Sequence, residues 1–249
     1  MVHPEPVVDD GGVVVVGPPL VPLGQAHPGH VVGQVEMDGD VVLGQVARLV
    51  ERAGEAVEHV AALGPVEVHP VTEDRLDDWL DFFDHHAMVD VPHNAACYCL
   101  EAHERSPGDP LPAPRHWTER RAEMLDRLRA GAAFGYLAYV DGRPAAWVNA
   151  SRRADTSLFR RGDDVDATTV AVACFAVAPP YRGHGLARRL LDRVVADAGG
   201  RGATAVEAYP PVGEVPSGVN FRGGRPMYDA AGFTEVKVRS RDVVVRRAV

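Results

Sequence analysis

The sequence predicts an α/β fold of the α+β kind, in which helices flank a mixed, mostly antiparallel sheet. Residues 170–209 read as a strand, a loop, a helix and a second strand, for which a right-handed parallel crossover is the default. The apolar runs 133–140 and 145–150, separated by a turn that begins Asp-Gly, predict an antiparallel hairpin. Residues 234–239 and 243–247 predict a second antiparallel pair. A chain of 249 residues that is 46% apolar can bury a large core around such a sheet.

The other elements of the predicted sheet domain come earlier in the chain or between these strands. Residues 66–71 read as a first strand, and residues 74–83 as a helix with Thr72 as its N-cap. A second helix is expected over residues 117–130, and a short one around Met227 precedes the last two strands.

The first 65 residues do not fit this plan. Residues 1–24 are rich in Val, Pro and Gly and predict a loose arm, whereas residues 42–63 carry apolar side chains at helical spacing and predict one amphipathic helix. We therefore divide the chain into an N-terminal extension, residues 1–65, and a domain, residues 66–249. The predicted helix would form a partner or homodimer contact or belong to a variable extension, and we favour the second interpretation.

Charge and composition exclude several classes of function. A net charge of −9 argues against a nucleic-acid-binding surface. The apolar runs are far shorter than a membrane span, and no Lys or Arg precedes Arg48 to begin a secretory leader. Three cysteines, an odd and small number, indicate free thiols. We expect a cytoplasmic protein that acts on neither nucleic acid nor membrane.

The loop inside the 170–209 unit carries the most specific chemistry. It reads Tyr-Arg-Gly-His-Gly-Leu-Ala from Tyr181 to Ala187. Its glycines let the backbone approach a ligand, and free amides at the start of a helix favour a phosphate. The spacing fits neither the dinucleotide pattern G-x-G-x-x-G nor a Walker G-K-[ST]. The pattern that remains is R-x-x-G-x-A, directly after a buried strand.

This pattern resembles motif A of the GNAT acyltransferases, the superfamily of acetyl-CoA-dependent N-acetyltransferases, whose Q/R-x-x-G-x-G/A loop holds the pyrophosphate of CoA. Farther along, Met-Tyr-Asp-Ala-Ala-Gly-Phe from Met227 to Phe233 is similar to the Y-x-x-x-G-F of the family's motif B. The resemblance extends over the domain from residue 66 and is weakest between residues 84 and 116. It implies the GNAT fold, with the central sheet splayed at the two parallel strands of motif A.

The resemblance also implies how acetyl-CoA, the acyl-donor substrate, is held. The strand backbone at Phe175, Ala176 and Val177 would pair with the pantetheine arm, and the amide near Val177 would face the thioester oxygen. Because Pro179 and Pro180 cannot continue a ladder, we expect the strand to end where the gap to its neighbour opens. The pyrophosphate would lie on the loop, formed by Arg182, Gly183, His184, Gly185, Leu186 and Ala187.

One of these loop residues has alternative interpretations. Arg182 would contact a phosphate or brace the loop, and it could instead be a solvated surface arginine. Its place in the motif favours the first two.

Acyl transfer to an amine also needs a proton donor for the leaving thiolate and a base for the amine. By the resemblance, Tyr228 is the general acid, since a phenol with a pKa of ~10 can protonate a thiolate; the alternative is a core tyrosine. Many members carry a glutamate on the motif A strand where this chain has Ala171. Glu207 on the facing strand is the nearest substitute, as base or amine anchor, or else a paired structural carboxylate. A proton path through water, or an amine that binds neutral, stays open as well.

Cys174 and a cluster of histidines and cysteines are the residues that could carry other chemistry. Cys174 would need an adjacent base to act as a nucleophile, and no histidine is close in sequence, so a buried thiol is favoured. Between residues 84 and 116 the chain concentrates metal-ligand types, but their spacing is not that of a zinc site, and we expect no metal. We expect this segment to form the wall on the acceptor side. These residues are His85, His86, His93, Cys97, Cys99, His103 and His116.

The sequence thus predicts an N-acetyltransferase that moves an acetyl group from acetyl-CoA to a primary amine by direct attack in a ternary complex. The acceptor, a small molecule or a protein amine, is not readable from the sequence. One alternative is a catalytically idle acyl-CoA-binding sensor on the same fold, and another is a metal or thiol sensor.

Overall fold

The computed structural model describes residues 63–104, 115–157, 166–216 and 220–249. All of them lie in the second of two units into which the chain divides, Glu36–Val249. Nearly all of the expected extension, residues 1–65, and its amphipathic helix therefore lie outside the described residues. The division into an extension and a domain stays a prediction.

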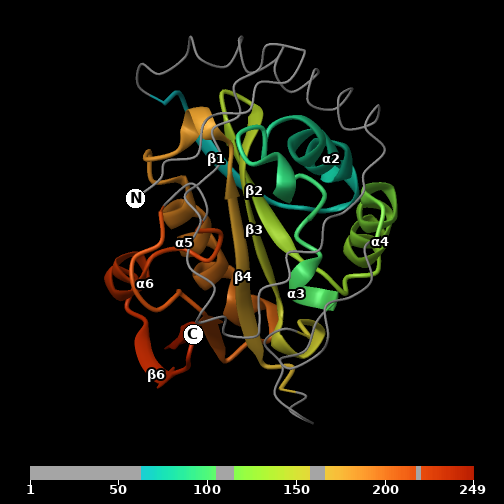
Figure 1. Cartoon of the computed structure of the whole chain (residues 1–249). Coiled ribbons are helices and arrows are strands. Elements are labelled where there is room, and N and C mark those ends of the chain that lie inside the picture. Colours follow the sequence, from blue (N-terminus) through green and yellow to red (C-terminus); the bar gives the residue numbers. More distant parts are fainter. Residues whose placement is uncertain (1–62, 105–114, 158–165, 217–219) are drawn as a thin grey trace, which may run out of the picture. The chain divides into compact units, whose positions relative to one another are not determined.

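Within the described residues, seven strands form one mixed sheet in the order β1-β2-β3-β4-β5-β7-β6 (Figure 1). All neighbours pair antiparallel except β4 and β5, which run parallel. The predicted sheet, mixed and mostly antiparallel, is confirmed. The strands are β1 Val66–Pro70, β2 Gly135–Val140, β3 Arg143–Arg152, β4 Thr169–Val177, β5 Ala205–Ala208, β6 Thr234–Val238 and β7 Val243–Ala248.

Helices cover both faces of this sheet (Figure 1). One face is packed by α5 (Leu186–Ala198) and α6 (Arg225–Ala230), and the other by α2 (Leu76–His85), α3 (Glu101–Glu104) and α4 (Trp117–Arg129). None of the helices in the described ranges is long and apolar enough to cross a membrane. Short 3-10 turns occupy Glu73–Arg75, Pro92–Asn94, Arg153–Asp155, Pro179–Tyr181 and Gly199–Arg201.

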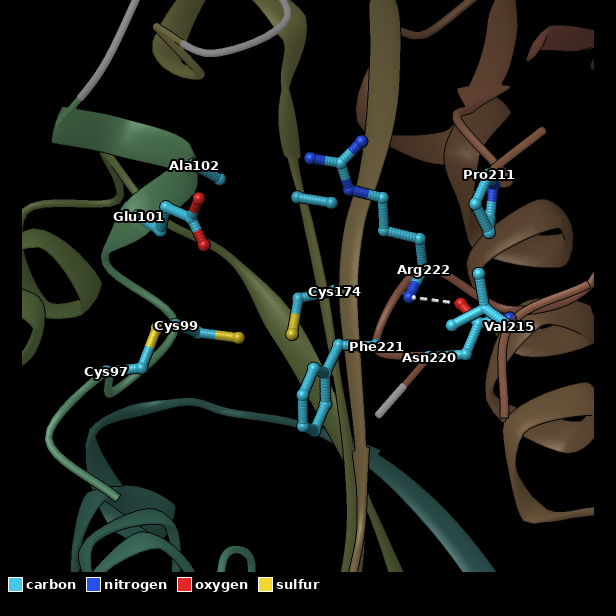
Figure 2. A pocket seen from close by; sticks show the side chains of 11 residues that line it. Cys97, Cys99, Glu101, Ala102, Cys174, Pro211, Val215, Asn220, Phe221 and Arg222 are labelled. Atoms are coloured by element: carbon cyan, nitrogen blue, oxygen red, sulfur yellow. Dashed lines mark hydrogen bonds between the residues drawn. The ribbon is translucent and has the colours of Figure 1, made fainter. Parts of the chain in front are cut away.

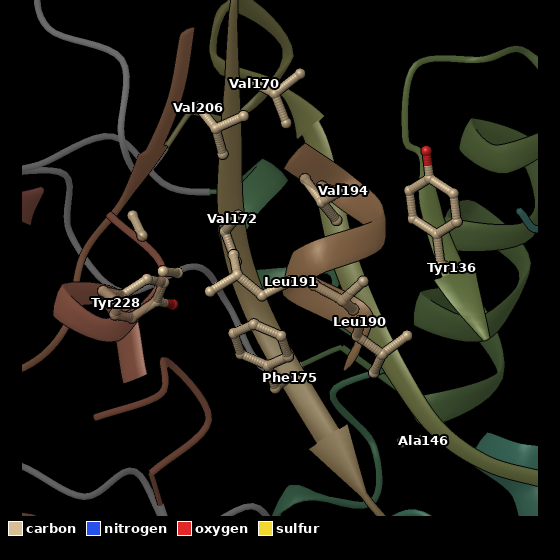
Figure 3. Close-up of a cluster of buried hydrophobic side chains, with 14 of the residues drawn as sticks. Tyr136, Ala146, Val170, Val172, Phe175, Leu190, Leu191, Val194, Val206 and Tyr228 are labelled. Atoms are coloured by element: carbon tan, nitrogen blue, oxygen red, sulfur yellow. The ribbon is translucent and has the colours of Figure 1, made fainter. Parts of the chain in front are cut away.

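Strand alternation divides the core between the two faces. On β2, Tyr136 and Ala138 pack toward α5, whereas Leu137 and Tyr139 pack toward α2 and α4. The predicted apolar face of α5 is buried against β3 and β4 (Figure 3). This packing fixes the start of α5, and therefore the loop before it, relative to β4. The buried residues of α5 are Leu186, Leu190, Leu191, Val194 and Ala198.

Two local expectations need correction. Thr72 does not cap α2, because a 3-10 turn comes first and the Thr72 hydroxyl donates instead to the Asp74 carboxylate at 2.5 Å. The β2–β3 turn consists of Asp141 and Gly142 alone, both with positive φ, so β3 already begins at Arg143. Positive φ at both positions is the conformation that Asp-Gly favours in a two-residue hairpin turn.

Candidate active site

β4 parts from β5 at a β-bulge. Parallel pairing with β5 ends at Val172, and on the opposite edge the pairing with β3 skips Ala173. An extra residue of this kind bends its strand and disrupts the ladder. The expected splay between the motif A strands is present, but the gap opens at Ala173. The expectation that it opens where the strand ends was wrong, since Pro179 and Pro180 form a turn past the end of β4.

Beyond the bulge, the backbone of β4 faces the gap. The Phe175 amide donates to the carbonyl of Phe221 at 2.5 Å, which places this N–H on the edge away from β3. Because N–H groups alternate between the two edges of a strand, Val177 presents its amide to the same side. The Val177 carbonyl accepts a hydrogen bond from Arg182 Nε at 3.0 Å. A ligand arm along this edge would thus meet two strand amides, one of which Phe221 already occupies.

A cavity of about 350 Å³ extends from this edge to the loop before α5, and we call it the loop cavity. It brings together the predicted donor-binding residues except Ala176 and His184. Ala176 is buried toward α2 and α4, and His184 is exposed on the loop. The lining residues are Phe175, Val177, Tyr181, Arg182, Gly183, Gly185, Leu186, Ala187, Arg188, Asn220, Phe221, Gly223, Gly224 and Met227.

The loop forms a cradle of backbone amides. Gly183 has a φ of +79° and Gly185, the N-cap of α5, a φ of +78°. A Cβ at either position would meet nothing within 4 Å, so crowding does not explain the glycines. The positive φ does, because residues with a Cβ rarely adopt it. The first-turn amides of α5 have no partner inside the helix, and the helix dipole is positive at this end. Since Leu186 and Ala187 line the loop cavity, the arrangement suits an anionic group such as a phosphate.

Arg182 braces this loop. Besides its bond to the Val177 carbonyl, its guanidinium pairs with both carboxylate oxygens of Asp90, with Nη2 at 3.0 Å from Oδ1. The side chain thereby ties the loop to the segment after α2 and to the end of β4. This geometry fits the bracing interpretation.

A second cavity, of about 230 Å³, adjoins the first, because Asn220 and Phe221 line both. All three cysteines of the chain line it, and we call it the thiol cavity. Figure 2 shows Cys99 and Cys174 approaching each other from the 97–102 segment and from β4. The complete lining is Cys97, Cys99, Glu101, Ala102, Ala173, Cys174, Pro211, Val215, Asn220, Phe221 and Arg222.

Two of these thiols are uncharged at neutral pH. Burial raises the pKa of Cys97 to about 11. Burial, together with the neighbouring Cys174, raises the pKa of Cys99 well above its usual value. The Cys174 thiol points at its neighbour's carbonyl, with Sγ at 3.6 Å from the oxygen of Phe175. Among the described residues, no histidine or carboxylate forms a hydrogen bond with Cys174 that could activate it as a nucleophile.

Tyr228 lies on α6, where it is fully buried. Its hydroxyl donates to the Arg222 carbonyl at 2.6 Å. Burial, followed by the proximity of Cys174, raises the pKa of Tyr228 above its usual range, so the phenol keeps its proton. Gly223, which lines the loop cavity, separates Tyr228 from it. A Cβ added to Gly223 would lie 3.2 Å from the Tyr228 hydroxyl oxygen. The role of general acid stays a prediction.

Glu207 is a buried carboxylate with three partners. Arg153 donates to both of its oxygens, at 3.3 and 3.2 Å. Arg246 donates to Oε1 at 3.3 Å and the Tyr209 hydroxyl to Oε2 at 3.0 Å. Glu207 lines neither cavity described above. Its role as a base or amine anchor stays a prediction, and the contacts fit the alternative of a paired structural carboxylate.

The described histidines of the 84–116 segment lie at three separate places. His85 and His86 contact Asp81 at 3.0 and 3.2 Å, and the His116 side chain caps α4. His103 is buried against β3, as described below. Among the side chains that the structure describes, which do not include that of His93, no three His, Cys, Asp or Glu residues could hold a metal ion together.

Sequence reasoning missed Glu101 and Phe221. Both lie in segments to which the sequence assigns no definite element: Glu101 in the expected acceptor-side wall, and Phe221 between the second motif A strand and Met227. Phe221 binds the Phe175 amide of β4, and Glu101 lines a cavity together with Ala173 and Cys174 of β4, and no local pattern records either arrangement.

Comparison with known families agrees with this geometry. Residues 96–218 match the acetyltransferase (GNAT) family, and they include β4, the glycine loop and α5. The chain belongs to the GNAT acetyltransferase family. Its general chemistry is therefore acetyl-CoA-dependent acetyl transfer. No curated protein matches the sequence.

Solved structures of several acetyltransferases are similar to this chain. The GNAT domain of S. lividans PAT has 21% identity and a TM-score of 0.46, over 75% of this chain and 92% of that one. For yncA from Salmonella typhimurium, whose structure contains its cofactor acetyl-CoA, the identity is 15% and the TM-score 0.43, over 74% and 93%. For the ribosomal-protein-S18-alanine N-acetyltransferase of Escherichia coli they are 13% and 0.41, also over 74% and 93%. Likeness at this level says nothing about the acceptor of this chain.

Proposed function

We propose that this protein moves an acetyl group from acetyl-CoA to a primary amine, by direct attack of the amine on the thioester in a ternary complex. One observation carries the proposal: the open edge of β4 leads along the loop cavity to the amide cradle at Gly183 and Gly185. Acetyl-CoA has the matching parts in the matching order. Its amide-bearing arm can pair with the strand edge, and its diphosphate suits the amides at the start of α5.

The same geometry assigns roles to the residues around the thioester. The Val177 amide faces the gap and would stabilise the oxyanion that forms on the thioester carbonyl. The amine would approach from the thiol cavity, which meets the loop cavity at Phe221. Tyr228, with its proton retained by burial, would protonate the departing thiolate past Gly223.

Glu207 has no part in this proposal. Its oxygens already accept hydrogen bonds from Arg153, Arg246 and Tyr209. The amine would instead lose its proton to water or bind in its neutral form.

One observation favours a second candidate, a catalytically idle acyl-CoA sensor. The Tyr228 hydroxyl is engaged by the Arg222 carbonyl. In a sensor this contact would persist, whereas in an enzyme the hydroxyl must turn toward the leaving thiolate. Both candidates require the 220–224 segment to shift, because the Phe221 carbonyl occupies the Phe175 amide that the ligand arm would need.

Calorimetry with acetyl-CoA, followed by a CoA-release assay with a panel of primary amines, tests both candidates. Binding heat together with amine-dependent release of CoA supports the transferase. Binding without release for any amine in the panel supports the sensor and contradicts the transferase. If saturating acetyl-CoA produces no heat, both candidates are wrong.

A further inference from the structure

The thiol cavity has one carboxylate on its wall. Glu101 lies on its wall, and in the described part of the chain the Glu101 side chain has no hydrogen bond or ion pair. Figure 2 shows its carboxylate turned toward the space between α3 and β4. The other acidic residue of α3, Glu104, is bound by Arg115 at 2.9 Å and by Arg120 at 2.7 Å.

The remaining residues of α3 hold Glu101 in this position. Ala102 is buried, and His103 is 3% exposed. His103 Nδ1 lies 2.9 Å from the Asp155 carbonyl, and His103 Nε2 lies 3.0 Å from the Asn149 amide nitrogen on β3. Because a carbonyl can only accept and an amide nitrogen can only donate, the imidazole is neutral with its proton on Nδ1. Three of the four side chains of α3 are thus fixed, and the fourth faces the cavity.

The other groups on the cavity wall are neutral or already paired. The thiols of Cys97 and Cys99, on the preceding segment, are neutral. Cys174 faces the cavity from β4. The Arg222 guanidinium, on the opposite wall, donates to Asp242 at 3.2 Å. The cavity therefore presents a carboxylate beside thiol and apolar groups, with the paired Arg222 and Asn220 as its other polar side chains.

Size and charge together define the ligand. A volume of about 230 Å³ lies below the ~300–1,000 Å³ of pockets for drug-sized molecules. A carboxylate pairs with a cation, and the rest of the lining favours an apolar body. A compact alkyl or arylalkyl amine combines these properties.

We propose that the thiol cavity is the acceptor site, that it takes a small primary amine with an apolar body, and that Glu101 binds the ammonium group. The inference rests on the proposed acetyl transfer. The ammonium gives up one proton before it attacks. The new N–C bond then forms as the thioester C–S bond breaks, the nitrogen loses its second proton, and the leaving thiolate takes up one. Glu101 recruits and orients the amine.

Alkylation of Cys174 reports occupancy of the cavity without acetyl-CoA. Cys174 is partly exposed and lines the cavity, so its rate of reaction with iodoacetamide at pH 7, followed by mass spectrometry, should fall when a ligand is bound. The probes are butylamine and its neutral isostere butanol. We expect butylamine to slow the reaction at least threefold more than butanol at equal concentration.

Two variants locate the effect. In Glu101→Gln, butylamine and butanol should protect Cys174 equally, because the charge that distinguishes them is gone. Glu67→Gln is the matched control, since Glu67 lies on β1 at the far edge of the sheet and the substitution removes the same charge. It should keep the wild-type preference. With acetyl-CoA present, Glu101→Gln should raise KM for butylamine about tenfold and leave KM for acetyl-CoA unchanged.

The outcomes separate this inference from the proposed function. Equal protection by the two probes in the wild type, or an undiminished preference in Glu101→Gln, overturns the assignment of Glu101. Protection by a lysine-containing tripeptide but not by butylamine overturns the small amine as acceptor. Failure of the wild type to bind acetyl-CoA removes the proposed transfer, and the alkylation result then shows only whether the cavity binds amines.

Discussion

Glu207 and Glu101 are both carboxylates beside β4, and they differ in whether their oxygens are available. Glu207 is 3% exposed and accepts hydrogen bonds from two arginines and a tyrosine. Glu101 is exposed, lines a cavity and has no partner among the described residues. The first carboxylate stabilises the β5–β7 end of the sheet, and the second can bind a ligand. The position of a carboxylate on a motif strand therefore does not decide its role. The role depends on whether other side chains already occupy its oxygens.

The largest expected effect separates these two glutamates by stability. Glu207→Ala removes a buried carboxylate that accepts hydrogen bonds from Arg153, Arg246 and Tyr209, although Arg153 keeps Asp166 at 3.1 Å. It should lower the free energy of unfolding by about 3 kcal/mol. Glu101→Ala removes no hydrogen bond or ion pair to the part of the chain that the structure describes, and should change it by less than about 0.5 kcal/mol. Urea unfolding of the two variants measures the difference. Equal losses would contradict the comparison.

Tyr228 and Tyr136 allow the same comparison between a proposed reactive role and a structural one. Tyr228→Phe should lower kcat about 100-fold, because a general acid is lost, and lower the free energy of unfolding by about 1 kcal/mol. Tyr136→Phe is the matched control, since this buried tyrosine also loses one hydrogen bond, to Asp197 at 3.0 Å. It should show a similar stability loss with kcat unchanged. Full kcat across the pH range in Tyr228→Phe would show that Tyr228 is not the acid.

The amide cradle can be tested with two glycines of equal backbone conformation. Gly185 and Gly142 have φ values of +78° and +76°, and an added Cβ would meet nothing at either. Changing either to Ala should cost about 1 kcal/mol of stability, because L-residues are strained at positive φ. Only Gly185→Ala should also weaken acetyl-CoA binding, about tenfold by calorimetry, or about 1.4 kcal/mol. Equal affinities in both variants would place the diphosphate elsewhere.

The sequence predicts well the part of the site that is built from local signals, namely β4, the glycine loop and α5. The apolar run before the loop, the glycines at 183 and 185, and the amphipathic spacing of α5 each follow from residues adjacent in the chain. The structure reproduces them within a residue or two. The hairpin and the two terminal strands were predictable for the same reason.

The thiol cavity, in contrast, depends on contacts between segments that are distant in the sequence. The bulge at Ala173 is a property of register with β3, which no pattern within β4 reveals. The meeting of Cys99 with Cys174, and the anchoring of His103 by Asn149, join parts of the chain far apart in sequence. A cluster of His and Cys could be seen in the sequence, but only the fold shows that the thiols line one cavity while the described histidines lie at separate places.

His103, which anchors α3, should make the stability of the fold depend on pH. Burial lowers the pKa of His103 below its ordinary value of 6.5. Below about pH 6.5 the unfolded chain takes up a proton at this residue and the folded chain does not. The free energy of unfolding should therefore decrease as the pH is lowered, by at most about 1.4 kcal/mol per pH unit. His103→Gln should remove this contribution. A slope unchanged between pH 6.5 and 5.5 in urea unfolding of the variant would contradict the assignment.

The smallest expected effect concerns Arg182. If it braces the loop through Asp90, then Arg182→Ala and Asp90→Asn should each weaken acetyl-CoA binding by a similar factor, about threefold or 0.7 kcal/mol, because both release the same contact. If Arg182 instead contacts the diphosphate directly, Asp90→Asn should leave the affinity unchanged or raise it, and only Arg182→Ala should weaken it. Calorimetry at two salt concentrations sharpens the distinction. A direct phosphate contact makes the loss in Arg182→Ala larger at low salt, whereas bracing leaves both variants with the salt dependence of the wild type.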